Sequence, residues 1–194
     1  MKRLVPYLIG AAATAAVFGV AALAIVEFGL FEVQASVPHS PLVAWATHTT
    51  MIHAVDRDAA AIPRLRPFTV AETEAGFRLY DRDCVACHGA PGVPREPWAA
   101  GMTPSPPYLI DAPRHWTSRQ LNFIVSNGVK MTGMPAWSTV HSPAELRAIV
   151  AFLEAQPYLT ARDYLRFRQA TTGGRLPVRS RGVAQTTPSP PVTP

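Results

Sequence analysis

Residues 84–88, Cys-Val-Ala-Cys-His, are the part of this chain whose types and spacing are best suited to chemistry. Two thiols three positions apart, followed directly by an imidazole, are typical of covalent haem attachment. In that chemistry the cysteines add across the two vinyl groups of the porphyrin as thioethers, and the histidine becomes an axial ligand of the iron. The motif therefore predicts that Cys84 and Cys87 hold a haem c and that His88 ligates its iron.

A redox-active dithiol of the thioredoxin type is the alternative interpretation of the same two cysteines. That motif opens a helix after a strand in a βαβ unit, whereas here the cysteines follow a predicted helix. The chain has only these two cysteines, which excludes a disulfide framework and a structural zinc site built from paired CxxC motifs. We therefore favour haem attachment.

The second axial ligand is expected to be a soft or nitrogen donor that follows the motif in the chain. The candidates are Met102, His115, Met131, Met134 and His141. We select Met134 because Gly133 permits a close approach of the backbone and Pro135 restricts the conformation of the residue before it. Met131, three residues earlier, is the main competitor. Trp137 would then lie close to the haem edge, with its indole N–H free to meet a propionate.

The segments that must position these residues have helical patterns, and no strand pattern is found. Residues 41–61 carry apolar residues mostly at three- and four-residue intervals and are predicted to form a helix or a helix plus turns. A second helix is predicted over residues 71–83. Capping boxes at 117–120 and 142–145 predict two more helices, which end at Asn127-Gly128 and at Pro157. Residues 160–169 are expected to form a last short helix, and the proline-rich stretch 89–113 a loop. The predicted fold class is all-α.

The first thirty residues predict a membrane anchor. No charged residue occurs from Leu4 to Val26, and a helix of that length spans roughly 35 Å, enough for a hydrocarbon core of about 30 Å. Lys2 and Arg3 are expected to stay on the cytoplasmic side, which places the rest of the chain outside. A cleaved signal peptide is the alternative, with Val33-Gln34-Ala35 before Ser36 as its site, but its apolar region is longer than usual.

The net charge of +5 does not indicate nucleic-acid binding. Much of the basic excess lies at Lys2 and Arg3 and in the tail, and the charges between Phe68 and Ala170 nearly cancel. A basic face set with aromatic residues is not found, so no nucleic-acid partner is expected. Residues 171–194 are rich in Pro and Thr and are predicted to be disordered.

From residue 69 to residue 157 the chain resembles the class I cytochrome c family. The order of motifs is similar: a helix, CxxCH, a loop with prolines, a middle helix, a methionine loop and a last helix. Gly76 and Tyr80 resemble the small-plus-aromatic pair on the first helix of the family, and Ile149 and Phe152 resemble their contacts on the last. The resemblance implies helices packed around one covalent haem.

The same resemblance assigns further roles. Residues 107–109 resemble the Pro-x-Leu whose proline carbonyl holds the axial histidine, so Pro107 is expected to hold His88. Pro38-His39 and residues 45–55 resemble, more loosely, the membrane-proximal part of anchored bacterial monohaem cytochromes.

The expected organisation has four parts. Residues 1–31 are the transmembrane anchor or uncleaved signal, and residues 32–66 are a membrane-proximal helical segment and linker. The cytochrome c domain covers 67–170, and the tail covers 171–194.

These features imply an electron carrier and not an enzyme, because His88 and Met134 would fill both axial positions and leave no open site for a substrate. It would lie on the periplasmic side of a bacterial cytoplasmic membrane and exchange electrons with redox partner proteins or a respiratory or dehydrogenase complex. Two alternatives stay open: a haem c subunit permanently docked on a periplasmic dehydrogenase or oxidase, and a haem-based redox or gas sensor.

Overall fold

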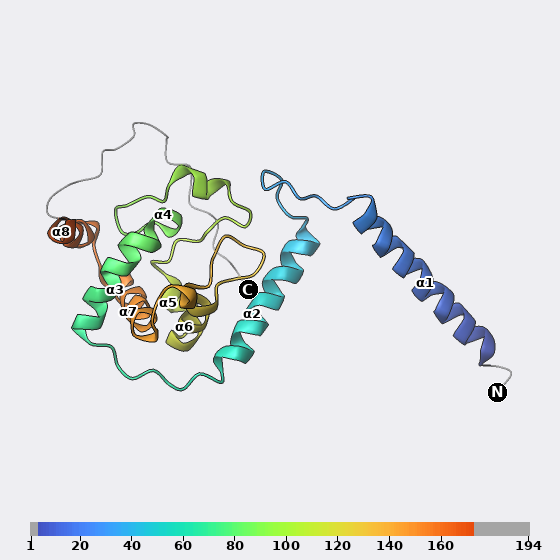
Figure 1. The fold of residues 1–194 in the computed structure, drawn as a ribbon, viewed down its shortest axis with the longest axis horizontal. Coiled ribbons are helices and arrows are strands. Elements are labelled where there is room, and N and C mark those ends of the chain that lie inside the picture. Colours follow the sequence, from blue (N-terminus) through green and yellow to red (C-terminus); the bar gives the residue numbers. More distant parts are fainter. Residues whose placement is uncertain (1–3, 173–194) are drawn as a thin grey trace. The chain divides into compact units, whose positions relative to one another are not determined.

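The structure, a computed structural model, describes residues 4–172, and this part of the chain contains helices and no β-strand (Figure 1). Its elements, in chain order, are α1 (Val5–Glu27), α2 (Pro41–Ala59), α3 (Val70–Asp83), α4 (Val85–His88), η1 (Pro97–Gly101), α5 (Ala112–His115), α6 (Ser118–Asn127), η2 (Trp137–Thr139), α7 (Pro143–Ala155), η3 (Gln156–Tyr158) and α8 (Ala161–Thr172). The predicted all-α fold class is confirmed.

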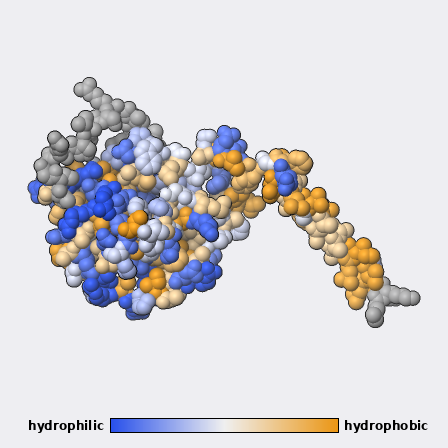
Figure 2. Space-filling model, viewed as in Figure 1, coloured by the Kyte–Doolittle hydropathy of each residue, from blue (hydrophilic) through white to orange (hydrophobic). Residues whose placement is uncertain are grey.

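Helix α1 is long and apolar enough to cross a membrane, by its length and composition. It belongs to a first compact unit that ends at Pro38, and a second unit begins at His39. Figure 2 shows a nearly continuous apolar surface along this helix. None of its side chains is buried, so α1 adds nothing to the hydrophobic core of the described residues.

The core of the second unit lies where α3 packs against α7 (Figure 1). Tyr80 of α3 and Phe152 of α7 are fully buried, with ring centroids 5.1 Å apart. The two backbones meet at Gly76, because a Cβ atom there would lie 1.8 Å from the carbonyl oxygen of Ala148 and 2.9 Å from the Cβ of Phe152. The nearest contact of Gly76 is thus Ala148, next to the expected Ile149.

We expect Gly76→Ala to destabilise the second unit, although alanine is the better helix former. The added methyl group overlaps the Ala148 carbonyl, so α3 and α7 must move apart, and overpacking of this kind costs about 1–3 kcal/mol or more. Thermal unfolding followed by circular dichroism measures the loss. Gly101→Ala is the matched control, because a Cβ there meets nothing within 4 Å. Equal melting temperatures for the two variants would contradict the tight α3–α7 contact.

Both predicted capping boxes are confirmed, and their helices begin where local hydrogen bonding requires. Thr117 caps α6 with Gln120, and Ser142 caps α7 with Glu145. Gly128 follows α6 with φ +66°, a conformation that favours glycine. The first residues of α6 and α7 are therefore fixed by hydrogen bonds within their own first turns.

The prediction of a plain loop over residues 89–113 was incomplete. The short helix η1 lies within this stretch, and α5 begins at its end. Proline occupies the first turn of both elements, where its missing N–H has no partner to lose. In the same way Pro157 lies inside η3, and α7 ends at Ala155. The last helix, α8, runs two residues into the predicted tail, and the tail beyond Thr172 lies outside the described residues.

Helix α2 packs against α6 in the unit that begins at His39. Val55 and Ala59 are its buried residues. The Gln120 side-chain amide donates to the carboxylate of Asp56, and the Arg119 guanidinium donates to the carbonyl of Ile62. The structure thus groups α2 with the later helices, while the boundary at residue 66 stays a prediction.

Candidate functional site

The CxxCH motif lies at the junction of α3 and α4. Cys84 follows the last residue of α3, and its N–H donates to the carbonyl of Tyr80. The chain then turns directly into α4, where the N–H of His88 donates to the carbonyl of Cys84 at 2.9 Å. Cys84 is buried, Cys87 is half-buried, and neither forms a disulfide. One short helical turn therefore brings both thiols and the imidazole together.

His88 is buried and held by the segment that the sequence resemblance indicated. Its Nδ1 lies 2.7 Å from the carbonyl oxygen of Pro107. A neutral imidazole donates from Nδ1 in this bond, which leaves Nε2 free as a ligand atom. Burial lowers the pKa of His88, the bond to Pro107 opposes this, and the nearby Arg95 lowers it further. The ring is thus kept neutral, as ligation of iron requires.

Arg95 and Tyr108 fix the loop that carries Pro107, and the sequence analysis missed both. The Arg95 guanidinium donates to the carbonyl of Pro106 and lies 4.9 Å from the centroid of the Tyr108 ring. The Tyr108 ring also closes on Gly89, where a Cβ atom would be 2.9 Å from its Cε1. A basic and an aromatic residue flanking the prolines were the available signal, but only the folded loop shows that they meet.

The environment of Cys84 does not suit a redox-active dithiol. Burial raises the pKa of its thiol to about 12, and the neighbouring Asp83 carboxylate adds to the effect. Reactive cysteines instead have lowered pKa values and partial exposure. The motif also follows helix α3 directly, with no strand among residues 4–172. The thioredoxin-type alternative therefore has no structural support.

The candidate sixth ligands have different surroundings. Met134 is half-buried, its N–H donates to Thr132 Oγ1 at 3.0 Å, and its carbonyl accepts from Val129 at 3.1 Å. Met131 is 85% exposed with φ +61°. Met102 lies against Gly133, where a Cβ atom would be 1.8 Å from the Met102 Cε. The loop therefore holds Met134 by its backbone and leaves the Met131 side chain in solvent.

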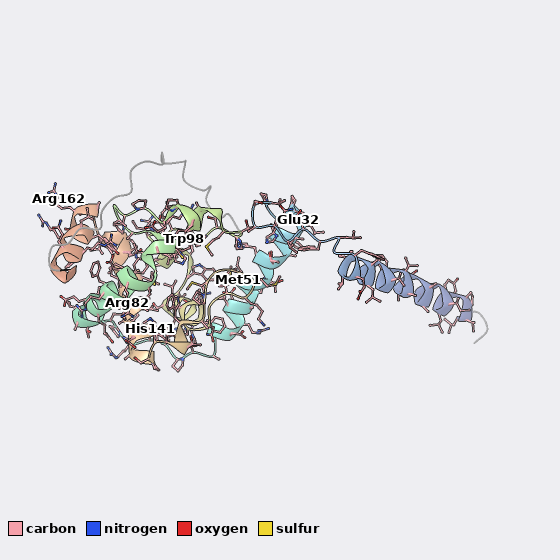
Figure 3. The ribbon with its side chains drawn as sticks, turned by 45° about the horizontal axis from the view of Figure 1, so that its top comes forward. Glu32, Met51, Arg82, Trp98, His141 and Arg162 are labelled. Atoms are coloured by element: carbon pink, nitrogen blue, oxygen red, sulfur yellow. The ribbon has the colours of Figure 1, made fainter. Side chains whose placement is uncertain are left out.

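The two histidine candidates for the sixth ligand differ in their exposure to solvent. His115 is exposed at the end of α5. His141, labelled in Figure 3, is buried, and its Nε2 lies 3.1 Å from Oδ2 of Asp83. The Trp137 ring packs beside it, with ring centroids 5.6 Å apart. His141 thus links the end of the methionine loop to the residue before Cys84, and the contact of Trp137 with the haem edge stays a prediction.

The donor set fits a covalent haem c. Two free thiols and a buried neutral imidazole with an available Nε2 lie within one turn. No group of three or more His, Cys, Asp or Glu side chains that could hold a metal ion occurs within residues 4–172. The thiols therefore suit attachment to a porphyrin, and the imidazole suits ligation of its iron.

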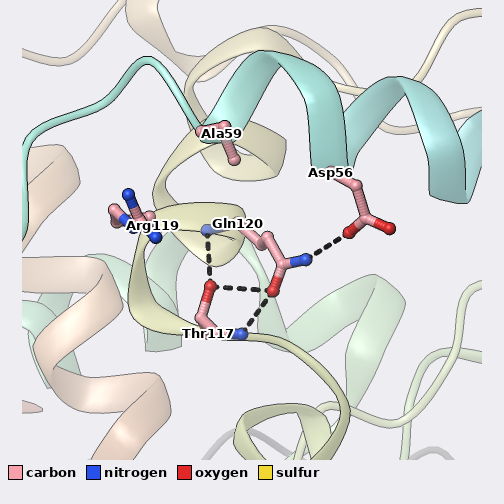
Figure 4. Close-up of a pocket in the computed structure, with 6 residues that line it drawn as sticks. Asp56, Ala59, Thr117, Arg119 and Gln120 are labelled. Atoms are coloured by element: carbon pink, nitrogen blue, oxygen red, sulfur yellow. Dashed lines mark hydrogen bonds between the residues drawn. The ribbon is translucent and has the colours of Figure 1, made fainter.

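A small surface pocket of about 130 Å³ lies elsewhere, between α2 and the start of α6 (Figure 4). Its lining residues are Asp56, Ala59, Ala60, Thr117, Arg119 and Gln120. Their polar groups largely bond one another, through the Thr117–Gln120 capping box and the Gln120–Asp56 hydrogen bond. This pocket lies at the contact between α2 and α6, and none of the predicted haem residues lines it.

Comparison with known proteins points to the same segment. The model of the family described as cytochrome c oxidase, cbb3-type, subunit III matches residues 71–153. A quinohemoprotein alcohol dehydrogenase of Comamonas testosteroni is 33% identical over 84 residues, which cover 43% of this chain and 11% of that protein. No solved structure is significantly similar to the chain. Residues 71–153 therefore match c-type cytochromes and are consistent with the class I family, and this match implies a covalently bound haem c and haem-based electron transfer.

Proposed function

We propose that this chain carries one electron at a time on a single haem c, held by Cys84, Cys87 and His88 and ligated by His88 and Met134. The domain would face the periplasm from a bacterial cytoplasmic membrane, with α1 as its anchor. The observation that carries the proposal is the 2.7 Å contact between His88 Nδ1 and the Pro107 carbonyl. It sets a neutral, oriented imidazole directly beside both thiols.

The chain's own residues perform three tasks in this proposal. His88 presents Nε2, and its Nδ1–H bond to Pro107 makes the ring a better electron donor. The Arg95–Tyr108 contact keeps that carbonyl in place. Met134 supplies a thioether from a loop tied down by hydrogen bonds. Haem c supplies the one-electron couple when it is bound, and His/Met ligation raises its potential.

The anchor sets where this chemistry occurs. Helix α1 has 23 residues, about 35 Å of helix, which matches a hydrocarbon core of about 30 Å. Lys2 and Arg3 precede it, and the positive-inside rule keeps them cytoplasmic. The cytochrome domain would then lie in the compartment where haem c proteins are assembled and partners of the respiratory chain or a dehydrogenase are within reach.

A second candidate function is a haem subunit permanently docked on a dehydrogenase or oxidase complex. It is favoured by the comparisons, since one match is a family of oxidase subunits and the other is a stretch of an alcohol dehydrogenase that is itself a haem protein by name. The matched stretch makes up 11% of that longer enzyme.

Extraction of the full-length protein from membranes with a mild detergent tests the proposal. We expect the haem to fractionate with membranes, at one haem per chain by pyridine haemochrome. A chain starting at Ser36 behind a separate signal peptide should be soluble and keep its haem. A mature protein that begins at Ser36, by mass spectrometry, would contradict the anchor. Stoichiometric co-purification of an oxidoreductase would instead favour the docked subunit.

A further inference from the structure

We propose that the first turns of α2 lie in the membrane interface and form a second contact with lipid beyond the anchor. This inference rests on the proposed function, because it requires α1 to span the membrane. The contact is made by Leu42 and Trp45, here called the apolar overhang. Its ligand is the boundary between the headgroups and acyl chains of the bilayer.

The apolar overhang is exposed in the structure. Leu42 is 71% exposed and Trp45 is 65% exposed, three positions apart on one helix. The buried contacts of α2, Val55 and Ala59, are confined to its other end, where it packs on α6. The first turns of α2 therefore present large apolar side chains that the domain itself does not cover.

The segment around the overhang also lacks charge. No Asp, Glu, Lys or Arg occurs from residue 33 to residue 55, whereas Asp56, Arg57 and Asp58 follow immediately. Even the exposed Thr47 turns its hydroxyl back onto the helix, where it donates to the carbonyls of Val43 and Ala44. A water-exposed helix face normally carries charged residues, and the first turns of α2 carry none.

The length of chain between α1 and α2 favours lipid over a protein partner. Helix α1 ends at Glu27 and α2 begins at Pro41, so residues 28–40 bridge at most about 45 Å and as a flexible chain roughly 20 Å. The overhang thus stays near the bilayer surface once α1 is inserted. Tryptophan is enriched at that depth because its ring is amphipathic, and the absence of nearby charge makes the contact independent of anionic lipid.

Spin-label accessibility in the full-length haem protein, reconstituted in phosphatidylcholine vesicles, tests this contact. Single cysteines replace Leu42, Trp45, Tyr158 and Val17 in separate variants, and each carries a nitroxide. Tyr158, which is 86% exposed, is the aqueous control, and Val17 of α1 is the lipid control. Wild-type protein should take no label, because Cys84 and Cys87 are thioethers. A variant is used only if its haem spectrum matches that of the wild type, which shows that its haem domain is folded.

We expect labels at 42 and 45 to show a several-fold higher ratio of oxygen to nickel-chelate accessibility than the label at 158, unchanged in high salt. If position 17 lies in lipid while 42 and 45 behave like 158, the interfacial contact is wrong and the anchor stands. Protection of 42 and 45 from both reagents would mean burial against protein and would also overturn the contact. An aqueous position 17 would overturn the anchor together with the contact.

Discussion

Replacing His88 or the two cysteines should remove covalently bound haem from this protein. Cys84→Ala and Cys87→Ala each leave a single thioether and should reduce covalent incorporation, and the double variant should reduce it to background. His88→Ala should abolish normal ligation, because the 2.7 Å bond to Pro107 orients that one imidazole and no other. Haem staining on denaturing gels measures attachment, and the pyridine haemochrome of the membrane fraction measures content.

Exposed histidines provide the matched controls for this result. His115→Ala removes an imidazole from the end of α5 and His53→Ala one from α2, both exposed to solvent. Both variants should keep wild-type haem content. If denaturing gels release haem from the wild-type chain, covalent attachment through Cys84 and Cys87 is wrong. If His115→Ala loses the haem as His88→Ala does, the assignment of the proximal ligand is wrong.

Met134→Ala should have the second largest effect, on the electronic properties of the haem. Oxidised cytochromes with His/Met ligation show a weak sulfur-to-iron band in the far red, and this band should disappear. The potential should fall on the order of 100 mV, within the roughly 0.8 V that axial ligands cover. The reduced variant should bind CO, because the sixth position is open. Spectroelectrochemical titration measures the band and the potential together.

Two other methionines test the selection of Met134. Met131→Ala should leave the far-red band unchanged, because the Met131 side chain is 85% exposed. Met102→Ala should also retain the band, with a smaller shift in potential, because Met102 packs on Gly133 beside the predicted ligand. Loss of the band in either variant but not in Met134→Ala would move the sixth ligand. Binding of CO by the reduced wild type at neutral pH would favour the sensor alternative.

The sequence alone was sufficient to predict features that depend only on residues close together in the chain. The capping boxes at Thr117 and Ser142 were predicted because each needs only residues three positions apart. The continuous apolar run that forms α1 was predicted for the same reason, since its length and lack of charge do not depend on the rest of the fold. The CxxCH motif is equally local, because one helical turn is enough to bring its three functional side chains together.

Family resemblance indicated contacts that no local pattern could have shown. It pointed to Pro107 as the partner of His88, and in the structure their polar atoms are 2.7 Å apart. It also pointed to Ile149 and Phe152 as the contacts of Gly76 and Tyr80, and the structure places the Phe152 ring 5.1 Å from that of Tyr80. Nearest to Gly76 is the carbonyl of Ala148, because a glycine is approached by the opposing backbone, which carries no sequence signal.

Only the tertiary structure decided the remaining features of the site. The Arg95–Tyr108 contact, the Asp83–His141 pair and the packing of α2 on α6 join residues far apart in the chain. Their side chains are common surface types, and what they contact depends on how the loops close and how the helices pack. By itself the sequence determined the cofactor chemistry, the longer helices and the apolar run of α1, because these follow from short-range spacing. The fold decided which methionine is held and which is exposed, because that depends on backbone hydrogen bonds formed only when the loop is closed.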